Sequence, residues 1–236
     1  MSAVIAVTSW YGTFYPDGGR TGLTYTEALH PFNEFKKSGY KVTIVSETGA
    51  QVDFDDLSTS PKFLYGEDRA MYDDPNSEFN ICLKNVKKAS EVDPKDFNIF
   101  YAAGGHGTVM DFETASGLQR LAEEIYSHGG IVSAVCHGPM VFRGMKDADG
   151  ESFIKGKKIA GFMDEGEEAI GLTQWLKDKK LPFTKESIEA AGGIFHHPTD
   201  PWEDYSIADG RIVTGTNPAS AGSVAKLALK VAGVST

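Results

Sequence analysis

Two patterns of apolar and polar residues take turns along this chain. Short runs rich in β-branched residues are followed by longer segments in which apolar residues recur at helical spacing. This order is typical of an α/β fold in which helices cover both faces of a mostly parallel central sheet. The predicted strands cover residues 3–8, 41–46, 97–103, 131–135 and 157–162, and a hairpin is predicted over 205–215 around the turn Asp209-Gly210.

Three segments have the clearest helical pattern. One covers residues 25–37 and ends at Gly39, and we expect Pro31 to kink or split it. A C-terminal helix begins in the sequence NPASAG, where Pro218 suits a first turn. The third helix ends at Gly129-Gly130 and carries its apolar residues on one face: Leu118, Leu121, Ala122, Ile125 and Tyr126.

The segment from about residue 47 to residue 90 departs from this alternation. It is irregular and rich in Asp, Ser and Pro as far as residue 76, and it is predicted to be helical over 77–86. Long structureless loops are uncommon inside a compact domain, so we interpret the segment as a small cap or insertion on the core. The sequence shows no internal repeat and no low-complexity linker, which predicts a single domain over residues 1–236.

The net negative charge of the chain argues against partners that are themselves polyanionic. Asp and Glu number 33 against 23 Lys and Arg, a net charge of -10, and such a surface repels nucleic acid and anionic membranes. No run approaches the ~18 to 20 apolar residues that span a bilayer, and the first residues do not resemble a signal peptide. Two cysteines, Cys82 and Cys136, fit a reducing compartment better than a disulfide scaffold. We therefore expect a cytoplasmic protein that binds neither nucleic acid nor membrane.

The strongest candidate for chemistry is Cys136. It follows the apolar strand 131–135, and Gly138-Pro139 begins a helix directly after it, as in a nucleophile elbow. Ligands of open α/β sheets bind at that edge, and a helix N-terminus there is expected to lower the pKa of the thiol. The alternative is that Cys136 only packs in the core, as many free cysteines do.

Two further positions have both a catalytic and a structural interpretation. His137 has a pKa range suited to a general base, but neighbours on an elbow are expected to point apart, and it could equally be a structural cap. The glycine-rich turn 104–107 (GGHG) follows a strand and lacks the GxGxxG spacing of a dinucleotide site. Its N–H groups could bind an oxyanion, or it could be a flexible turn.

Several acidic residues are candidate partners of these groups. Glu27 completes a Thr24-x-x-Glu27 capping box, and Glu167 and Glu168 follow a predicted strand end, where either could orient His137 or simply favour a helix N-terminus. The pair His196-His197, with Asp200 and Glu203, is a weak candidate for a metal site, because adjacent histidines rarely converge on one ion. We therefore predict no metal site.

The strings AVCHGP (134–139) and AAGGHGT (102–108) resemble the ThiJ/PfpI superfamily. Four more strings resemble its fungal heat-shock chaperone-like branch, the glutathione-independent glyoxalases (glyoxalase III, D-lactate dehydratase). They are TSWYGTFYPDGGRTGLTYTEALHPF, VSETG, GFMDEGEEAIG and PWEDYSIADGRIVTGTNPASA, and the likeness spans nearly the whole chain in order. The resemblance implies a class I glutamine amidotransferase-like, flavodoxin-like three-layer sandwich.

The resemblance also implies an activity and the residues that carry it. The activity is conversion of a small 2-oxoaldehyde, methylglyoxal, to D-lactate without glutathione or any cofactor. The resemblance further implies a homodimer that occurs in the cytoplasm and also in the nucleus. Cys136 would be the nucleophile, His137 the general base and Glu167 the third triad member, with Glu168 as its rival. Glu27 would contact the sulfur, and the Gly105 amide would bind substrate oxygen. Competing hypotheses are a stress-response holdase, which the apolar residues of 54–72 could serve, a peptidase or amidase, and a redox sensor.

Overall fold

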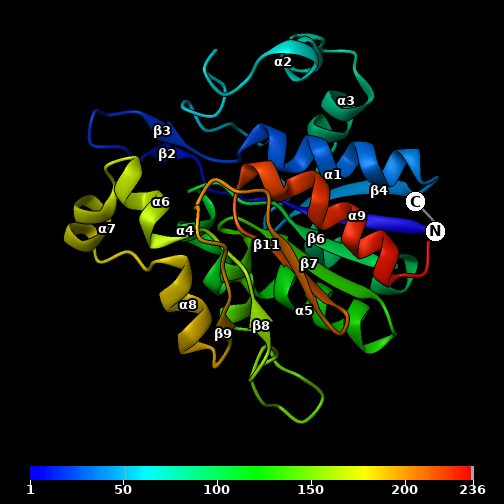
Figure 1. Cartoon of the computed structure of the whole chain (residues 1–236). Helices are drawn as coiled ribbons and strands as arrows, with labels where there is room; N and C mark the ends of the chain where they lie inside the picture. The colour runs from blue at the N-terminus through cyan, green and yellow to red at the C-terminus, as the bar shows by residue number, and fades with distance from the viewer. Residues whose placement is uncertain (51, 235–236) are drawn as a thin grey trace.

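A seven-stranded sheet forms the centre of the computed structural model, which describes residues 1–50 and 52–234 (Figure 1). In spatial order its strands are β10 (Ser206–Asp209), β11 (Ile212–Gly215), β7 (Ile131–Val135), β6 (Ile99–Ala102), β1 (Ser2–Ala6), β4 (Lys41–Ser46) and β5 (Lys87–Lys88). Neighbouring strands are parallel except β10 and β11, which form the predicted hairpin. The α/β class and the mostly parallel sheet are therefore confirmed.

Helices cover both faces of the sheet because each central strand is apolar on both sides. In β1, Ile5 faces one core and Val4 and Ala6 face the other. The first core lies under α1 (Tyr25–Lys37) and α9 (Ala221–Val231), which pack against each other. The second lies under α5 (Ser116–Ser127) and the 3₁₀ helix η4 (Gly138–Arg143). This arrangement is the expected three-layer sandwich.

The cap is more ordered than the sequence indicated. Within the stretch predicted to be irregular, α2 (Gly66–Asp73) is a helix, and it precedes α3 (Glu78–Lys84), which was predicted. Its aromatic residues pack edge-on around the Tyr25 ring of α1, with the centroids of Phe54, Tyr72 and Phe79 at 5.1–5.2 Å. Such rings bury a large area, so the aromatic residues that are scattered along the sequence of the cap form a small core in the folded protein.

Two other expectations about elements are corrected. The helix over 25–37 runs unbroken through Pro31, so the proline does not split it. The strand expected over 157–162 is only β8 (Lys158–Ile159), which pairs with β9 (Ile194–Phe195) outside the main sheet. Beyond β8 the backbone turns to the elbow instead, since the Phe162 N–H donates to the Cys136 carbonyl at 2.8 Å.

The remaining short elements lie between these strands and helices along the chain. They are the ribbon β2 (Gly12–Thr13) and β3 (Arg20–Thr21), α4 (Thr108–Asp111), α6 (Asp164–Ala169), α7 (Thr173–Lys179), α8 (Thr184–Ala190) and the 3₁₀ helices η1 (Ala89–Glu91), η2 (Pro94–Asp96), η3 (Phe112–Thr114) and η5 (Pro218–Ser220). None of the helices in the described part of the chain combines the length and the apolar character needed to span a bilayer.

Candidate active site

Cys136 stands at the turn between β7 and the 3₁₀ helix η4. Its backbone has a φ of 59°, which residues with a Cβ seldom adopt, and its N–H is fixed to the Gly215 carbonyl at 3.1 Å. The turn also needs Gly138, because a Cβ there would collide with the Ala102 carbonyl oxygen. The side chain is therefore held above the C-terminal edge of the sheet in a strained conformation, as a nucleophile elbow requires.

Three side chains form a hydrogen-bonded chain at this edge. His137 Nδ1 lies 3.2 Å from Cys136 Sγ, and His137 Nε2 lies 2.8 Å from Glu167 Oε1. All three residues are buried. The neighbours Cys136 and His137 therefore touch instead of pointing apart, because the left-handed turn at Cys136 brings the two side chains to the same side.

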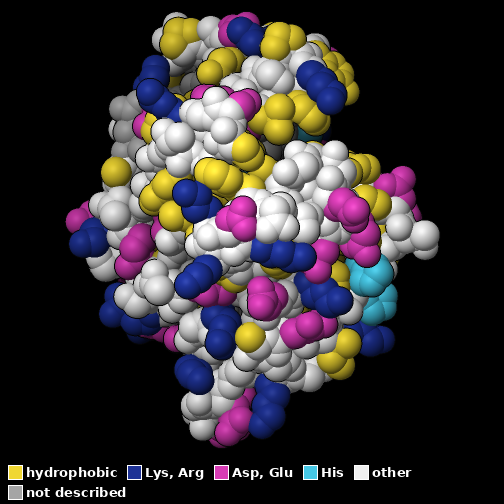
Figure 2. Space-filling view, turned by 90° about the vertical axis from the view of Figure 1, so that its left-hand side faces the viewer, with side chains coloured by type: hydrophobic (Ala, Val, Ile, Leu, Met, Phe, Trp, Pro, Cys, Tyr) yellow, Lys and Arg dark blue, Asp and Glu magenta, His cyan; other side chains and the backbone are white. Residues whose placement is uncertain are grey.

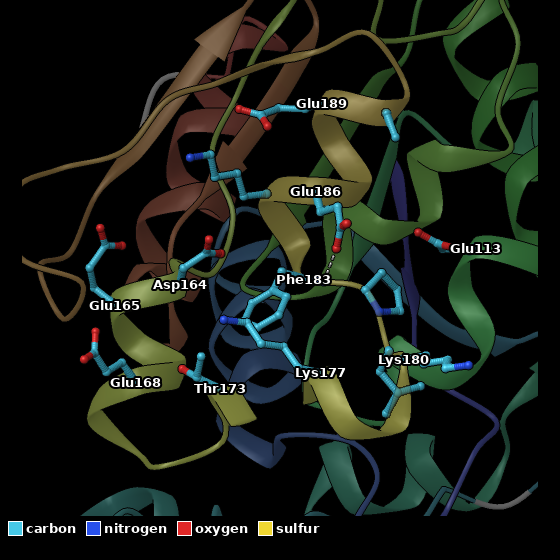
Figure 3. Close-up of a pocket in the computed structure, with 14 residues that line it drawn as sticks. Glu113, Asp164, Glu165, Glu168, Thr173, Lys177, Lys180, Phe183, Glu186 and Glu189 are labelled. Atoms are coloured by element: carbon cyan, nitrogen blue, oxygen red, sulfur yellow. Dashed lines mark hydrogen bonds between the residues drawn. The ribbon is translucent and has the colours of Figure 1, made fainter. Parts of the chain in front are cut away.

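Glu167 and Glu168 lie on different faces of α6. Glu167 is 2% exposed and faces the two histidines, whereas Glu168 is exposed. Glu168 lines a separate groove of about 1100 Å³ between α6, α7 and α8, together with charged residues such as Lys177 and Glu189 (Figure 3). The structure thus brings Glu167, and not Glu168, to His137.

Glu27 reaches the sulfur from α1. Its Oε2 accepts from the Gly104 N–H at 3.0 Å, while among the described residues Oε1 has no hydrogen-bond partner. Thr24 makes no side-chain cap bond to the helix, so the expected capping box does not form. Burial raises the pKa of Glu27 to about 8, so its carboxyl is mostly neutral at pH 7 and can donate a proton towards the thiol.

The thiol is not acidified in the way that the sequence suggested. Burial, and next the negative charge that Glu27 carries when it is ionised, hold the pKa of Cys136 well above its usual value. The backbone N–H groups of His137 and Gly105 face the sulfur and favour the thiolate, but their effect is smaller. In the resting protein the group is therefore a thiol, and its proton must pass to a base before it can attack.

Three functional neighbours were missed in the sequence. His106 Nε2 lies 3.1 Å from the second oxygen of Glu167, and His106 Nδ1 lies 3.3 Å from the Tyr15 hydroxyl, which donates to Asp55 at 2.5 Å. His106 is the one residue of the GGHG turn with a side chain, and from the sequence only the glycines and N–H groups of that turn were considered. Its partner Glu167 is 61 positions away, so sequence spacing gave no signal.

The pocket above the sulfur is small and has an apolar rim. Its volume is about 120 Å³, and its floor includes Glu27, Gly105, Cys136 and His137. Its rim includes Leu57, Phe63 and Trp202, which are 40–44% exposed although they are large and hydrophobic. Figure 2 shows hydrophobic side chains gathered in the upper half of one face of the molecule, while acidic and basic side chains mix over the lower half. The pocket suits a small uncharged ligand.

Potential metal ligands also meet at this site. Ligand atoms of His106, His137 and Glu167 lie within 4.8 Å of one another. Each of these atoms is already engaged in the hydrogen bonds described above, so we interpret the group as a proton-transfer network. The weaker candidate does not form a cluster of this kind: His196 bonds the Tyr205 hydroxyl at 2.6 Å, and His197 bonds the Pro198 carbonyl at 2.8 Å.

A strained cysteine at a strand-to-helix turn, with an adjoining histidine and a buried carboxylate, defines an α/β protein of the cysteine-elbow class. Residues 20–230 match the model of the DJ-1/PfpI family, and the chain belongs to that family. The resemblance found in the sequence is thereby confirmed.

Two curated proteins and one solved structure are similar to this chain over nearly its whole length. The chain is 48% identical to Glyoxalase 3 of Candida albicans over 222 residues, 94% of each chain. It is 46% identical to the glutathione-independent glyoxalase HSP31 of Saccharomyces cerevisiae over 223 residues, again 94% of each. The crystal structure of glyoxalase III from Candida albicans superposes with a TM-score of 0.94 at 46% identity, covering 98% of this chain and 97% of the other.

Proposed function

We propose that the protein is a glutathione-independent glyoxalase that converts methylglyoxal to D-lactate. The observation that carries this proposal is the chain Cys136–His137–Glu167 at the floor of a pocket of about 120 Å³. The names of the relatives support it, since they are glyoxalases over nearly the full length of the chain. In this proposal Cys136, His137 and Glu167 are catalytic, and Glu27 and Gly105 bind substrate.

The first step is attack on the aldehyde. Glu167 accepts a hydrogen bond from the Nε2–H of His137, so the proton stays on Nε2 and the Nδ1 lone pair faces the thiol at 3.2 Å. His137 takes the thiol proton as Sγ bonds the aldehyde carbon, and the carbonyl electrons move to the oxygen. The N–H groups of Gly105 and His137 face the sulfur, where they can also stabilise the adjacent oxyanion. The oxyanion takes the proton from His137, which gives a hemithioacetal and a neutral His137.

The second step moves a proton between adjacent carbons. The hemithioacetal C–H is acidic because a ketone lies next to it, and neutral His137 removes this proton to give an enediolate. The neutral carboxyl of Glu27 donates a hydrogen bond to the developing charge. The hydroxyl proton then moves from the oxygen on the first carbon to the oxygen on the second, a C=O bond forms at the first carbon, and His137 returns its proton to the former ketone carbon. The result is a lactoyl thioester, and delivery of the proton to one face of that carbon gives one enantiomer.

The last step releases the product. Water attacks the thioester carbonyl with His137 as base, the C–S bond breaks, and the thiol regains its proton as D-lactate leaves. The sum is methylglyoxal plus water to lactate and a proton. The steps are addition to a carbonyl, proton transfer and acyl transfer, so the reaction as a whole consumes no external oxidant or reductant.

The test is methylglyoxal consumption with chiral detection of lactate, without glutathione, for the wild type and Cys136→Ala. We expect D-lactate from the wild type and a loss of activity to background in the variant. Cys82→Ala is the matched control, because Cys82 lies on α3 away from the pocket lining, and it should retain activity. A wild type that forms no D-lactate contradicts the proposal.

The competing holdase hypothesis predicts a different result. A passive apolar surface, such as the rim with Leu57 and Phe63, does not depend on the thiol. Suppression of aggregation that is equal in the wild type and Cys136→Ala, in a protein without oxoaldehyde turnover, would favour that role instead.

A further inference from the structure

Glu167 serves two imidazoles, and the proposed reaction uses only one of them. His137 Nε2 lies 2.8 Å from Oε1 of Glu167, and His106 Nε2 lies 3.1 Å from its Oε2. The two rings lie with their centroids 4.3 Å apart, and all three side chains are at most 10% exposed. Buried histidines at this distance interact strongly, so the protonation of one affects the other.

Hydrogen-bond directions fix the protonation of His106. The Tyr15 hydroxyl has one proton, and it donates that proton to Asp55, whose other carboxylate oxygen accepts from the Ser58 N–H at 2.7 Å. The Tyr15 oxygen can therefore only accept from His106 Nδ1, which must carry a proton. His106 Nε2 must carry one as well, because ionised Glu167 is acceptor-only.

The charges around both rings agree with this assignment. Burial lowers the pKa of His106, but the charges of Glu167 and Asp55 raise it by more than burial lowers it. The pKa of His106 is therefore above its usual value. The pKa of His137 is lowered, first by burial and next by the charge of His106. Burial opposes the ionisation of Glu167, but the charge of His106 and the hydrogen bonds from both histidines outweigh it and hold the pKa of that carboxyl well below its usual range. The titratable groups that face the two rings are Tyr15, Glu27, Asp55, Cys136 and Glu167.

We propose that His106 is a buried imidazolium and a positioning residue: it shares Glu167 with His137, holds that carboxylate in place, and keeps His137 neutral with its Nδ1 lone pair facing the thiol. The proposal rests on the proposed function for its role in the reaction, but not for the charge of His106. Because a cation 4.3 Å away opposes a second positive charge, a proton on His137 is transferred onward readily.

The charge of His106 can be measured without substrate. In ¹⁵N-labelled protein, long-range ¹H–¹⁵N spectra of the imidazoles report the protonation of each ring nitrogen between pH 5 and pH 9. At pH 7 we expect two protonated nitrogens on His106 and one, Nε2, on His137. A neutral His106 at pH 7 overturns the proposal whether or not the protein turns over methylglyoxal, and an inactive protein with a charged His106 overturns only the proposed function.

A substitution tests the coupling between the rings. His106→Gln retains a donor for Glu167 but removes the charge, so the pKa of His137 should rise by about one pH unit or more, and the acid limb of kcat/KM should move up with it. His30→Gln is the matched control, since His30 also bonds a carboxylate, Asp68 at 2.9 Å, but lies outside the pocket lining. An unchanged pKa of His137 in His106→Gln overturns the proposal.

Discussion

At the scale of single residues, the two oxygens of Glu167 determine that the facing nitrogens of His106 and His137 both carry protons. Each oxygen accepts from an imidazole, so replacing one oxygen by an NH₂ group places donor against donor. In Glu167→Gln we therefore expect His137 to lose the tautomer that faces the thiol, and kcat to fall by about 10² to 10⁴-fold. Methylglyoxal kinetics measure this change.

Glu168→Gln is the control for that prediction. It makes the same change one position along α6, on an exposed side chain that lines the groove of Figure 3. We expect kcat to stay within about two-fold of the wild type, since surface substitutions away from a site have small effects. A larger loss in Glu168→Gln than in Glu167→Gln would mean that the wrong carboxylate has been assigned.

Glu27 gives the reaction an upper pH limit. Its pKa of about 8 means that it is neutral below that pH and ionised above it, where its charge opposes both the thiolate and the enediolate. We expect kcat/KM of the wild type to decline above about pH 8 and Glu27→Gln, which stays neutral, to lack this decline. A wild-type rate that keeps rising to pH 9.5 would contradict the role of a neutral Glu27.

The sequence indicated Cys136 and His137 because a short apolar strand followed by Gly-Pro is a local signal. The protonation state of Cys136 could not be predicted from the sequence. It depends on burial and on Glu27, which raise the thiol pKa, and Glu27 lies 109 positions away from the cysteine in the chain. His106 was missed for the same reason. Pairs of side chains that meet only after folding leave no spacing to detect.

At the scale of elements, one buried amide fixes the rim of the pocket. Asn217, at the start of the 3₁₀ helix before α9, accepts from the Ser220 N–H and donates to the carbonyls of Pro201 and Glu203 at 2.7 and 2.8 Å. These bonds hold the backbone on either side of Trp202, which lines the pocket. The loop at the rim is thereby attached to a helix of the main sandwich.

Asn217→Ala should therefore weaken both the fold and substrate binding. We expect a loss of about 1–3 kcal/mol in the free energy of unfolding, because two part-buried carbonyls lose their donor, and a larger effect on KM than on kcat. Urea unfolding and methylglyoxal kinetics measure the two effects. Asn85→Ala, which removes one exposed bond to the Ile81 carbonyl, should change neither by much.

Strands and long helices could be predicted from the sequence, because their periodicity reflects burial on one or both faces. Short elements could not. The phase of the six-residue α6 decides whether Glu167 or Glu168 is buried, and six residues contain too few apolar positions to set it. α2 was missed because it has no fully buried residue, so no apolar stripe marks it.

At the scale of the whole molecule, burial of neutral carboxyls makes stability fall as pH rises. The pKa of Glu27 is about 8 in the folded protein against 4.5 for an ordinary glutamate, and that of Asp111 is about 6 against 3.8. The folded chain binds these protons more tightly, so their stabilising contribution is full below pH 4 and is lost as pH rises through 6 and then 8.

Glu27→Gln should remove the later part of this loss. We expect the variant to exceed the wild type in stability at pH 9 by on the order of a few kcal/mol relative to the difference at pH 5. Thermal unfolding at the two pH values measures it, with the exposed Glu165→Gln as a control that should show no such change. A difference that is equal at both pH values would contradict the raised pKa.

The hydrogen-bonded chain from Cys136 to Asp55 also has a consequence for biosynthesis. It joins the ribbon, the cap, the GGHG turn, the elbow and α6, and the Cys136 amide is fixed by the carbonyl of Gly215. A nascent chain that has emerged from the ribosome only as far as residue 160 contains the cysteine but neither Glu167 nor Gly215. The thiol therefore gains its oriented base only when synthesis is almost complete, so we expect turnover of the aldehyde to begin only after the C-terminal strands have been made.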